Sequence, residues 1–174
     1  VERIDVTKNF TNGTNSAFYL NRTNNKSPFL TTDKQGTLSY IKTNGSISKT
    51  SFDSFSSGHH FFYEKFNEDS HYDFIYFDKN KLTVFDRFKE IVVERSFEDQ
   101  VLTEPEMTTF NDDKALIFTS LSDQRLYLVT KDGVNEKINR LEGSTLFDIG
   151  KLKRFGKNSV VVGKEEKVFK YLIE

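Results

Sequence analysis

The chain of 174 residues contains no cysteine, no tryptophan, two prolines and only one methionine. Without cysteine it has no disulfides, no zinc site built on thiolates and no thiol catalysis. No apolar run approaches the roughly 20 residues that a membrane-spanning helix needs, and no signal peptide opens the chain. Because the chain begins with Val1, we interpret it as a mature form or an excised domain.

The chain also lacks an excess of charge of either sign. Lys and Arg number 25 and Asp and Glu number 26, which gives a formal net charge of −1. A balanced surface creates no long-range field that would draw the protein to nucleic acid or to an anionic membrane. We therefore expect neither nucleic acid nor membrane insertion by this segment. The basic cluster at Lys151, Lys153, Arg154 and Lys157 is interpreted as a solvated strand end.

Aromatic residues are plentiful, with 18 Phe and 7 Tyr, and such usage favours pleated sheet over helix. The segment 73–86 shows the pattern most clearly, because two alternating apolar runs flank a polar turn. Asn44 and Gly45 mark another hairpin, for which we predict a type I′ turn with positive φ at both residues.

Near copies of segment 73–86 recur along the chain at a nearly constant spacing. Spacings of 44, 44 and 42 residues separate one set of strand landmarks: Leu38, Leu82, Leu126 and Val168. Spacings of 45, 42 and 44 residues separate the landmarks of the preceding strand: Leu30, Ile75, Ile117 and Val161. A period of 40–45 residues that holds four short strands is typical of a propeller blade.

The sequence therefore predicts an all-β fold, a β-propeller of about four blades in a single domain, 1–174. The expected repeat units are 17–52, 58–97, 104–140 and 144–173. A strand within 1–8 is expected to close the ring beside Lys167–Ile173. An open array cut from a propeller of six to eight blades is the alternative, and it would expose apolar flanks. A two-sheet β-sandwich is disfavoured because it has no reason to keep the period.

Three segments resemble the carboxy-terminal repeat region of large uncharacterised proteins of Bacteroidetes, especially flavobacteria-like bacteria. They are Thr32–Gly45, Tyr72–Arg87 and the ending that runs from Val162 to Ile173. More broadly, the units look like the quinoprotein-like and WD-like propellers. The resemblance implies a periplasmic or cell-surface protein of the envelope with no established activity.

The histidines are the first candidates for chemistry. His59 and His60 are adjacent on an expected strand, so their side chains point to opposite faces and cannot readily share one metal. We expect one of them to line a sheet face and His71 to lie in a turn. A quinoprotein-type cofactor would need a Trp-rich core, so no cofactor is expected.

Acidic residues between strands give the remaining candidates. Segment 67–73 occupies the place of the calcium loop in integrin-like repeats, and Asp69 and Asp73 would be its ligands. The glycine of such loops is missing, so an ordinary Asx-rich turn is the favoured interpretation. Asp112 and Asp113 lie at the equivalent place in the next unit, and we interpret them as a solvated loop rather than as catalytic carboxylates.

No phosphate-binding glycine loop and no G-x-S-x-G elbow is present. The sequence therefore predicts a protein that is not an enzyme. The leading hypothesis is a binding or scaffolding module whose loops or rim contact another protein or the rest of a larger parent chain. The alternative is a carbohydrate-binding or glycan-processing surface propeller, which exposed rings with two or three carboxylates in one funnel would favour.

Overall fold

The computed structural model describes residues 12–15, 18–22, 26–67, 69–98, 102–151 and 158–173. These residues form four antiparallel sheets in chain order and one short 3₁₀ helix, η1 (Ile138–Arg140). Within this described part, no helix is long and apolar enough to cross a membrane.

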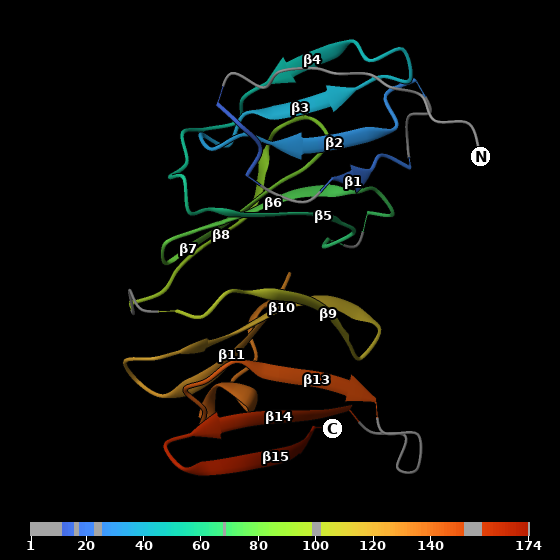
Figure 1. Ribbon diagram of the computed structural model, residues 1–174. Helices are drawn as coiled ribbons and strands as arrows, with labels where there is room; N and C mark the ends of the chain where they lie inside the picture. The colour runs from blue at the N-terminus through green and yellow to red at the C-terminus, as the bar shows by residue number, and fades with distance from the viewer. Residues whose placement is uncertain are drawn as a thin grey trace, which may run out of the picture.

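Each sheet is built from strands that follow one another in the sequence (Figure 1). The first sheet has the order β1 (Tyr19–Leu20), β2 (Phe29–Thr32), β3 (Leu38–Ile41), β4 (Ile47–Thr50). The second has the order β5 (His60–Glu64), β6 (Asp73–Asp78), β7 (Lys81–Phe85), β8 (Ile91–Ser96). The third has the order β12 (Gly133–Val134), β11 (Arg125–Thr130), β10 (Asp113–Ser120), β9 (Glu106–Phe110). The fourth has the order β13 (Phe147–Lys151), β14 (Asn158–Lys164), β15 (Lys167–Ile173).

The predicted hairpin at 73–86 is confirmed, with β6 and β7 joined by a two-residue turn between Asp78 and Lys81. The hairpin at Asn44 and Gly45 is also present, but its predicted turn type was wrong. Gly45 alone has positive φ, at 77°, and its N–H donates to the Lys42 carbonyl at 2.9 Å. This is a longer loop with a single left-handed residue, a position that glycine fills without steric cost.

Consecutive sheets stack face to face through three hydrophobic clusters. Phe61, Tyr76 and other rings fill the space between the first and second sheets. Aromatic and aliphatic residues, including Phe77 and Phe118, fill the next space. Mostly aliphatic residues such as Ile117 and Leu128 fill the third. Successive residues of a strand point to opposite faces of its sheet, so one strand contributes side chains to two clusters.

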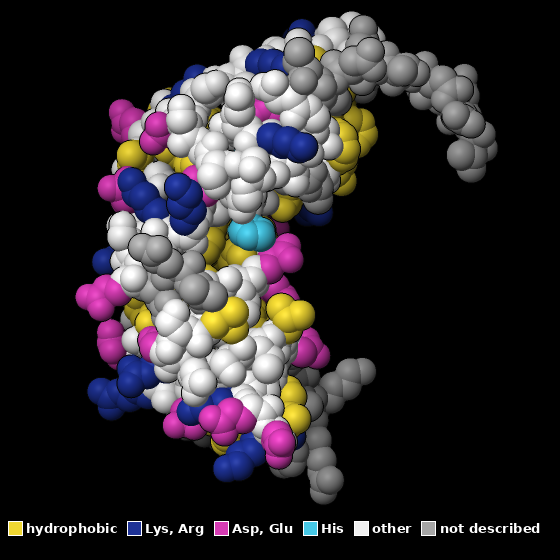
Figure 2. All heavy atoms as spheres, turned by 60° about the vertical axis from the view of Figure 1, so that its left-hand side comes forward, with side chains coloured by type: hydrophobic (Ala, Val, Ile, Leu, Met, Phe, Trp, Pro, Cys, Tyr) yellow, Lys and Arg dark blue, Asp and Glu magenta, His cyan; other side chains and the backbone are white. Residues whose placement is uncertain are grey.

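The all-β prediction is confirmed, and the four sheets rule out a two-sheet sandwich. The described residues form an open crescent instead of the closed ring that we predicted (Figure 2). The first and fourth sheets lie at opposite ends of the stack (Figure 1), since each of the three clusters joins a sheet to its neighbour in the chain and none joins the fourth sheet to the first. The predicted closing strand, 1–8, lies outside the described residues.

Candidate binding groove

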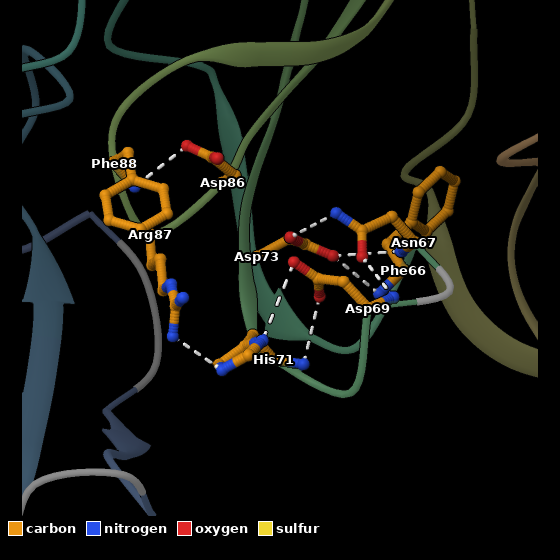
Figure 3. Close-up of polar contacts among 8 residues, drawn as sticks. All are labelled: Phe66, Asn67, Asp69, His71, Asp73, Asp86, Arg87 and Phe88. Carbon is orange, nitrogen blue, oxygen red and sulfur yellow. Dashed lines mark hydrogen bonds and ion pairs between the residues drawn. The ribbon is translucent and has the colours of Figure 1, made fainter.

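Asp73 is the first residue of β6, and its carboxylate organises the loop that precedes the strand. One oxygen, Oδ2, accepts hydrogen bonds from the backbone N–H groups of Phe66 and Asn67, both at 2.9 Å. The other, Oδ1, accepts one from the Asn67 amide at 3.0 Å (Figure 3). The residue is fully buried, and burial raises the pKa of this carboxyl, an effect that the two backbone N–H groups partly oppose.

Asp69 folds the tip of the same loop. Its backbone N–H donates to the side-chain oxygen of Asn67 at 2.9 Å, and its own Oδ1 accepts from the His71 N–H at 3.0 Å. These contacts are those of an Asx-rich turn. Among the described residues, no three side chains of His, Asp or Glu come together as metal ligands. Calcium binding by Asp69 and Asp73 stays a prediction.

His71 joins this loop to the turn between β7 and β8. The Arg87 guanidinium donates from Nη1 to Nε2 of His71 at 2.6 Å (Figure 3). Since Nε2 must accept, the neutral ring carries its proton on Nδ1, which lies 3.6 Å from a carboxylate oxygen of Asp69. The Arg87 guanidinium also lies 4.6 Å from the centre of the Phe88 ring. Arg87 is thereby oriented from two sides.

A cavity of about 450 Å³ opens beside Arg87, between the first and second sheets. It is lined by aromatic rings and three polar side chains: Tyr40, Tyr63, Tyr72, Phe74, Asn21, His71 and Arg87. Tyr40 comes from the first sheet and Phe74 from the second, so the stacking of the two sheets creates the cavity.

A second cavity of about 480 Å³ shares two of these tyrosines. It is lined by residues of three sheets and their loops: Phe18, Tyr19, Leu20, Arg22, Tyr63, Glu64, Lys65, Tyr72 and Lys114. The rings of Tyr63 and Tyr72 are stacked with centres 4.9 Å apart, and both residues line both cavities. We call the two cavities together the aromatic groove.

Cations outnumber acids in the aromatic groove, with Arg22, Lys65, Arg87 and Lys114 against Glu64 alone. Glu64 already pairs with Lys114 at 3.4 Å. The Lys65 ammonium lies 5.6 Å from the centre of the Tyr72 ring, a cation–π contact. The groove therefore offers ring faces and positive charge to a ligand.

Tyr19 and Tyr40 remain protonated phenols near neutral pH. Burial raises the pKa of Tyr40 to about 12, with Tyr63 a smaller cause, and raises the pKa of Tyr19 to about 12, with Glu64 a smaller cause. The Tyr19 hydroxyl donates to the Phe61 carbonyl at 2.7 Å. These hydroxyls can orient a ligand through hydrogen bonds but cannot act as bases near neutral pH.

The other sequence candidates lie outside the aromatic groove. His59 is buried between the first and second sheets, where its ring nitrogens lie 2.7 Å from the Ser56 carbonyl and 3.2 Å from the Thr32 hydroxyl. His60 faces the other way, 3.7 Å from Glu104, and burial lowers its pKa. Asn111 and Asp112 form a turn, both with positive φ, and Asp113 begins β10.

Sequence reasoning did not identify the groove residues Arg87, Tyr40, Tyr63 and Tyr72. A usable signal is the choice of Tyr where neighbouring strands carry Phe, since a buried phenol needs a partner or an opening to water. Most of the basic cluster at 151–157 lies outside the described residues. No protein-family model matches the chain, and no curated protein matches it.

Proposed function

We propose that the chain is a non-enzymatic binding module and that the aromatic groove contacts a protein partner. The observation that carries this proposal is the pairing of stacked rings with excess positive charge in one groove. Tyrosine and arginine are the residues that most often dominate binding energy at protein interfaces, since they combine a large apolar surface with oriented donors. An acidic side chain of the partner fits against Arg87.

The composition of the groove favours a protein over a glycan. A sugar-binding funnel would combine exposed rings with two or three carboxylates, but the groove has only Glu64, which is already paired with Lys114. The stacked Tyr63 and Tyr72 rings keep the glycan alternative open to experiment, because sugars also bind on aromatic faces.

The architecture supports a scaffold role for the rest of the chain. The sequential order of strands within each sheet and the nearly constant spacing of the landmarks support the interpretation of the four sheets as blades of a propeller-type repeat. The resemblance to repeat regions of Bacteroidetes supports a periplasmic or cell-surface location. In that setting the partner is a second protein or another part of a larger parent chain.

A peptide-display experiment tests the groove directly. Random peptides selected on the wild-type chain should be enriched in acidic and aromatic residues. Arg87→Glu and Tyr72→Ala should each weaken the selected peptides at least about tenfold, roughly 1.4 kcal/mol. Lys81→Glu, a charge reversal at an exposed lysine on β7 away from the groove, should bind as wild type. Equal binding by all three variants would overturn the proposal.

A glycan array screened with the same variants tests the alternative that the groove binds a sugar. Glycan binding that Tyr72→Ala abolishes, without any groove-dependent peptide, would replace the protein partner by a sugar. Circular dichroism of each variant should match wild type, so that a lost fold is not mistaken for lost binding.

A further inference from the structure

The four sheets carry aliphatic residues at two equivalent positions of the central hairpin. In each sheet the central hairpin has the same register, shown by four cross-strand pairs: Thr32 with Leu38, Phe77 with Leu82, Thr119 with Leu126 and Gly163 with Val168. In each pair the first residue lies two positions after the landmark of the earlier strand. Leu30, Ile75, Ile117 and Val161 are therefore equivalent, and so are the four landmarks of the later strand.

These landmarks lie on the face that each sheet turns toward the next sheet in the chain, which we call the forward face. In the first three sheets all six landmarks are 0% exposed: Leu30, Leu38, Ile75, Leu82, Ile117 and Leu126. In the fourth sheet Val161 is 40% exposed and Val168 is 77% exposed. Leu172, on the same face of β15, is also exposed. The fourth sheet thus shows a forward face that no described residue covers.

The opposite face of each sheet, which we call the back face, receives the forward face of the preceding sheet. Phe74, Leu116 and Val160 are equivalent positions on the back faces of the later sheets, and all three are buried. Their equivalent in the first sheet is Phe29, which is 42% exposed. Its cross-strand neighbour Leu20 is 56% exposed, whereas the equivalent Tyr63 is buried.

We propose that a second copy of this chain covers these faces, with the forward face of the fourth sheet of one copy against the back face of the first sheet of another. The forward face of the fourth sheet and the exposed Phe29 and Leu20 edge of the first sheet correspond to the two sides of an interface that the chain already makes three times within itself. A head-to-tail contact of this kind uses different surfaces on the two partners, so it closes into a ring or grows into a filament. The crescent in Figure 2 is a shape from which two or more copies can build a ring.

Both end faces are less apolar than the inner ones, which makes the association reversible. On the forward face, Lys170 stands where the earlier sheets carry Tyr40, Val84 and Leu128. On the back face of the first sheet, Thr31 stands where the second sheet carries Tyr76, and Thr31 is already buried. The contact therefore depends on the exposed Phe29 and Leu20 edge, and it should form at high protein concentration.

The proposal goes beyond binding at the aromatic groove. Leu20 also lines the second cavity of the groove, but Val168 and Phe29 line neither cavity, so variants at these two positions separate loss of self-association from loss of peptide binding.

Sedimentation equilibrium over a wide range of concentrations tests the proposal. The mass should rise from 20.2 kDa to twice that value or a higher multiple. Val168→Asp and Phe29→Asp should each weaken self-association at least about tenfold. Val92→Asp, at an exposed valine on β8 of an inner sheet, should associate as wild type. Circular dichroism should show that all three variants are folded.

A mixture of the Val168→Asp and Phe29→Asp chains tests whether the contact between copies is head-to-tail. In a head-to-tail contact, each variant still has one intact face, so the mixture should form a dimer of defined mass that neither variant forms alone. A monomer of 20.2 kDa at every concentration would overturn the proposal, as would a mixture that stays monomeric while wild type associates.

Discussion

The second and fourth sheets carry aliphatic residues at the same position of the same strand and bury them to opposite degrees. Leu82 on β7 has no exposed surface, whereas Val168 on β15 is mostly exposed. The strand pattern is alike in both sheets, but no described sheet follows the fourth, and β15 is an edge strand whereas β7 lies between β6 and β8. Burial in this fold is thus a property of the neighbour and not of the strand, which is why an end sheet exposes what an inner sheet conceals.

The largest difference in the free energy of unfolding should appear between the truncations of these two equivalent side chains. Leu82→Ala removes apolar surface from the fully packed second interface and should destabilise the fold by about 3 kcal/mol. Val168→Ala should change the free energy of unfolding by less than about 0.5 kcal/mol in dilute solution. Urea unfolding at low protein concentration measures both values, and similar losses for the two variants would contradict the comparison.

The next largest difference concerns Asp73 on β6 and its equivalent on β14, Ser159. Asp73→Ala leaves two backbone N–H groups and one amide of the 66–73 loop without their acceptor, which should cost about 2 kcal/mol. Ser159 donates one hydrogen bond, to the Gly150 carbonyl at 3.1 Å, so Ser159→Ala should cost only about 0.5–1 kcal/mol. Thermal unfolding of the two variants measures the loss of stability in each. A larger loss for Ser159→Ala than for Asp73→Ala would contradict this prediction.

A smaller effect isolates the hydroxyl of Tyr76. This buried phenol donates to the Gly36 carbonyl at 3.1 Å, while its equivalent in the third sheet is Phe118. Tyr76→Phe keeps the ring, which stacks on Phe55 with centres 4.1 Å apart, and should destabilise the fold by about 1 kcal/mol. A loss above about 3 kcal/mol would mean that the ring itself had moved, which the aromatic spectrum in near-ultraviolet circular dichroism would reveal.

A further effect appears only in alkaline solution. Tyr19 and Tyr40 have pKa values raised from 10.0 to about 12 in the folded state. Between pH 10 and 12 the unfolded chain loses these protons first, so stability is complete below pH 10 and falls as the pH rises. The double variant Tyr19→Phe, Tyr40→Phe should show a shallower fall. Chemical unfolding at several pH values measures this fall in stability. Parallel curves of stability against pH for wild type and the double variant would show that Tyr19 and Tyr40 do not cause the fall.

The sequence was sufficient for the sheets but not for their arrangement. Alternating runs and a constant spacing predicted hairpins such as β6–β7, because the two-residue period of a strand is visible in the chain itself. The turn at Gly45 took a different geometry, since loop length and not dipeptide identity decided how many residues adopt positive φ. Ring closure depends on the angle between sheets, which no local pattern contains.

The candidate site shows the same limit. Asp73 was singled out as a carboxylate before a strand, and the structure assigns its oxygens to the N–H groups of its own loop. The groove was missed because Tyr40 lies on the first sheet and Arg87 in the turn between β7 and β8, far apart in the sequence. Their proximity arises only when the first two sheets stack.

Cross-linking through introduced thiols is the most direct test of the equivalence between end faces and inner faces. The chain has no cysteine, so Phe29→Cys and Val161→Cys place a single thiol on the back face of the first sheet and on the forward face of the fourth. With a short bis-maleimide, a mixture of the two variants should give a covalent dimer that joins the two different chains. Cross-linking of Val161→Cys to itself alone, or no dimer in the mixture at concentrations where wild type associates, would contradict the account.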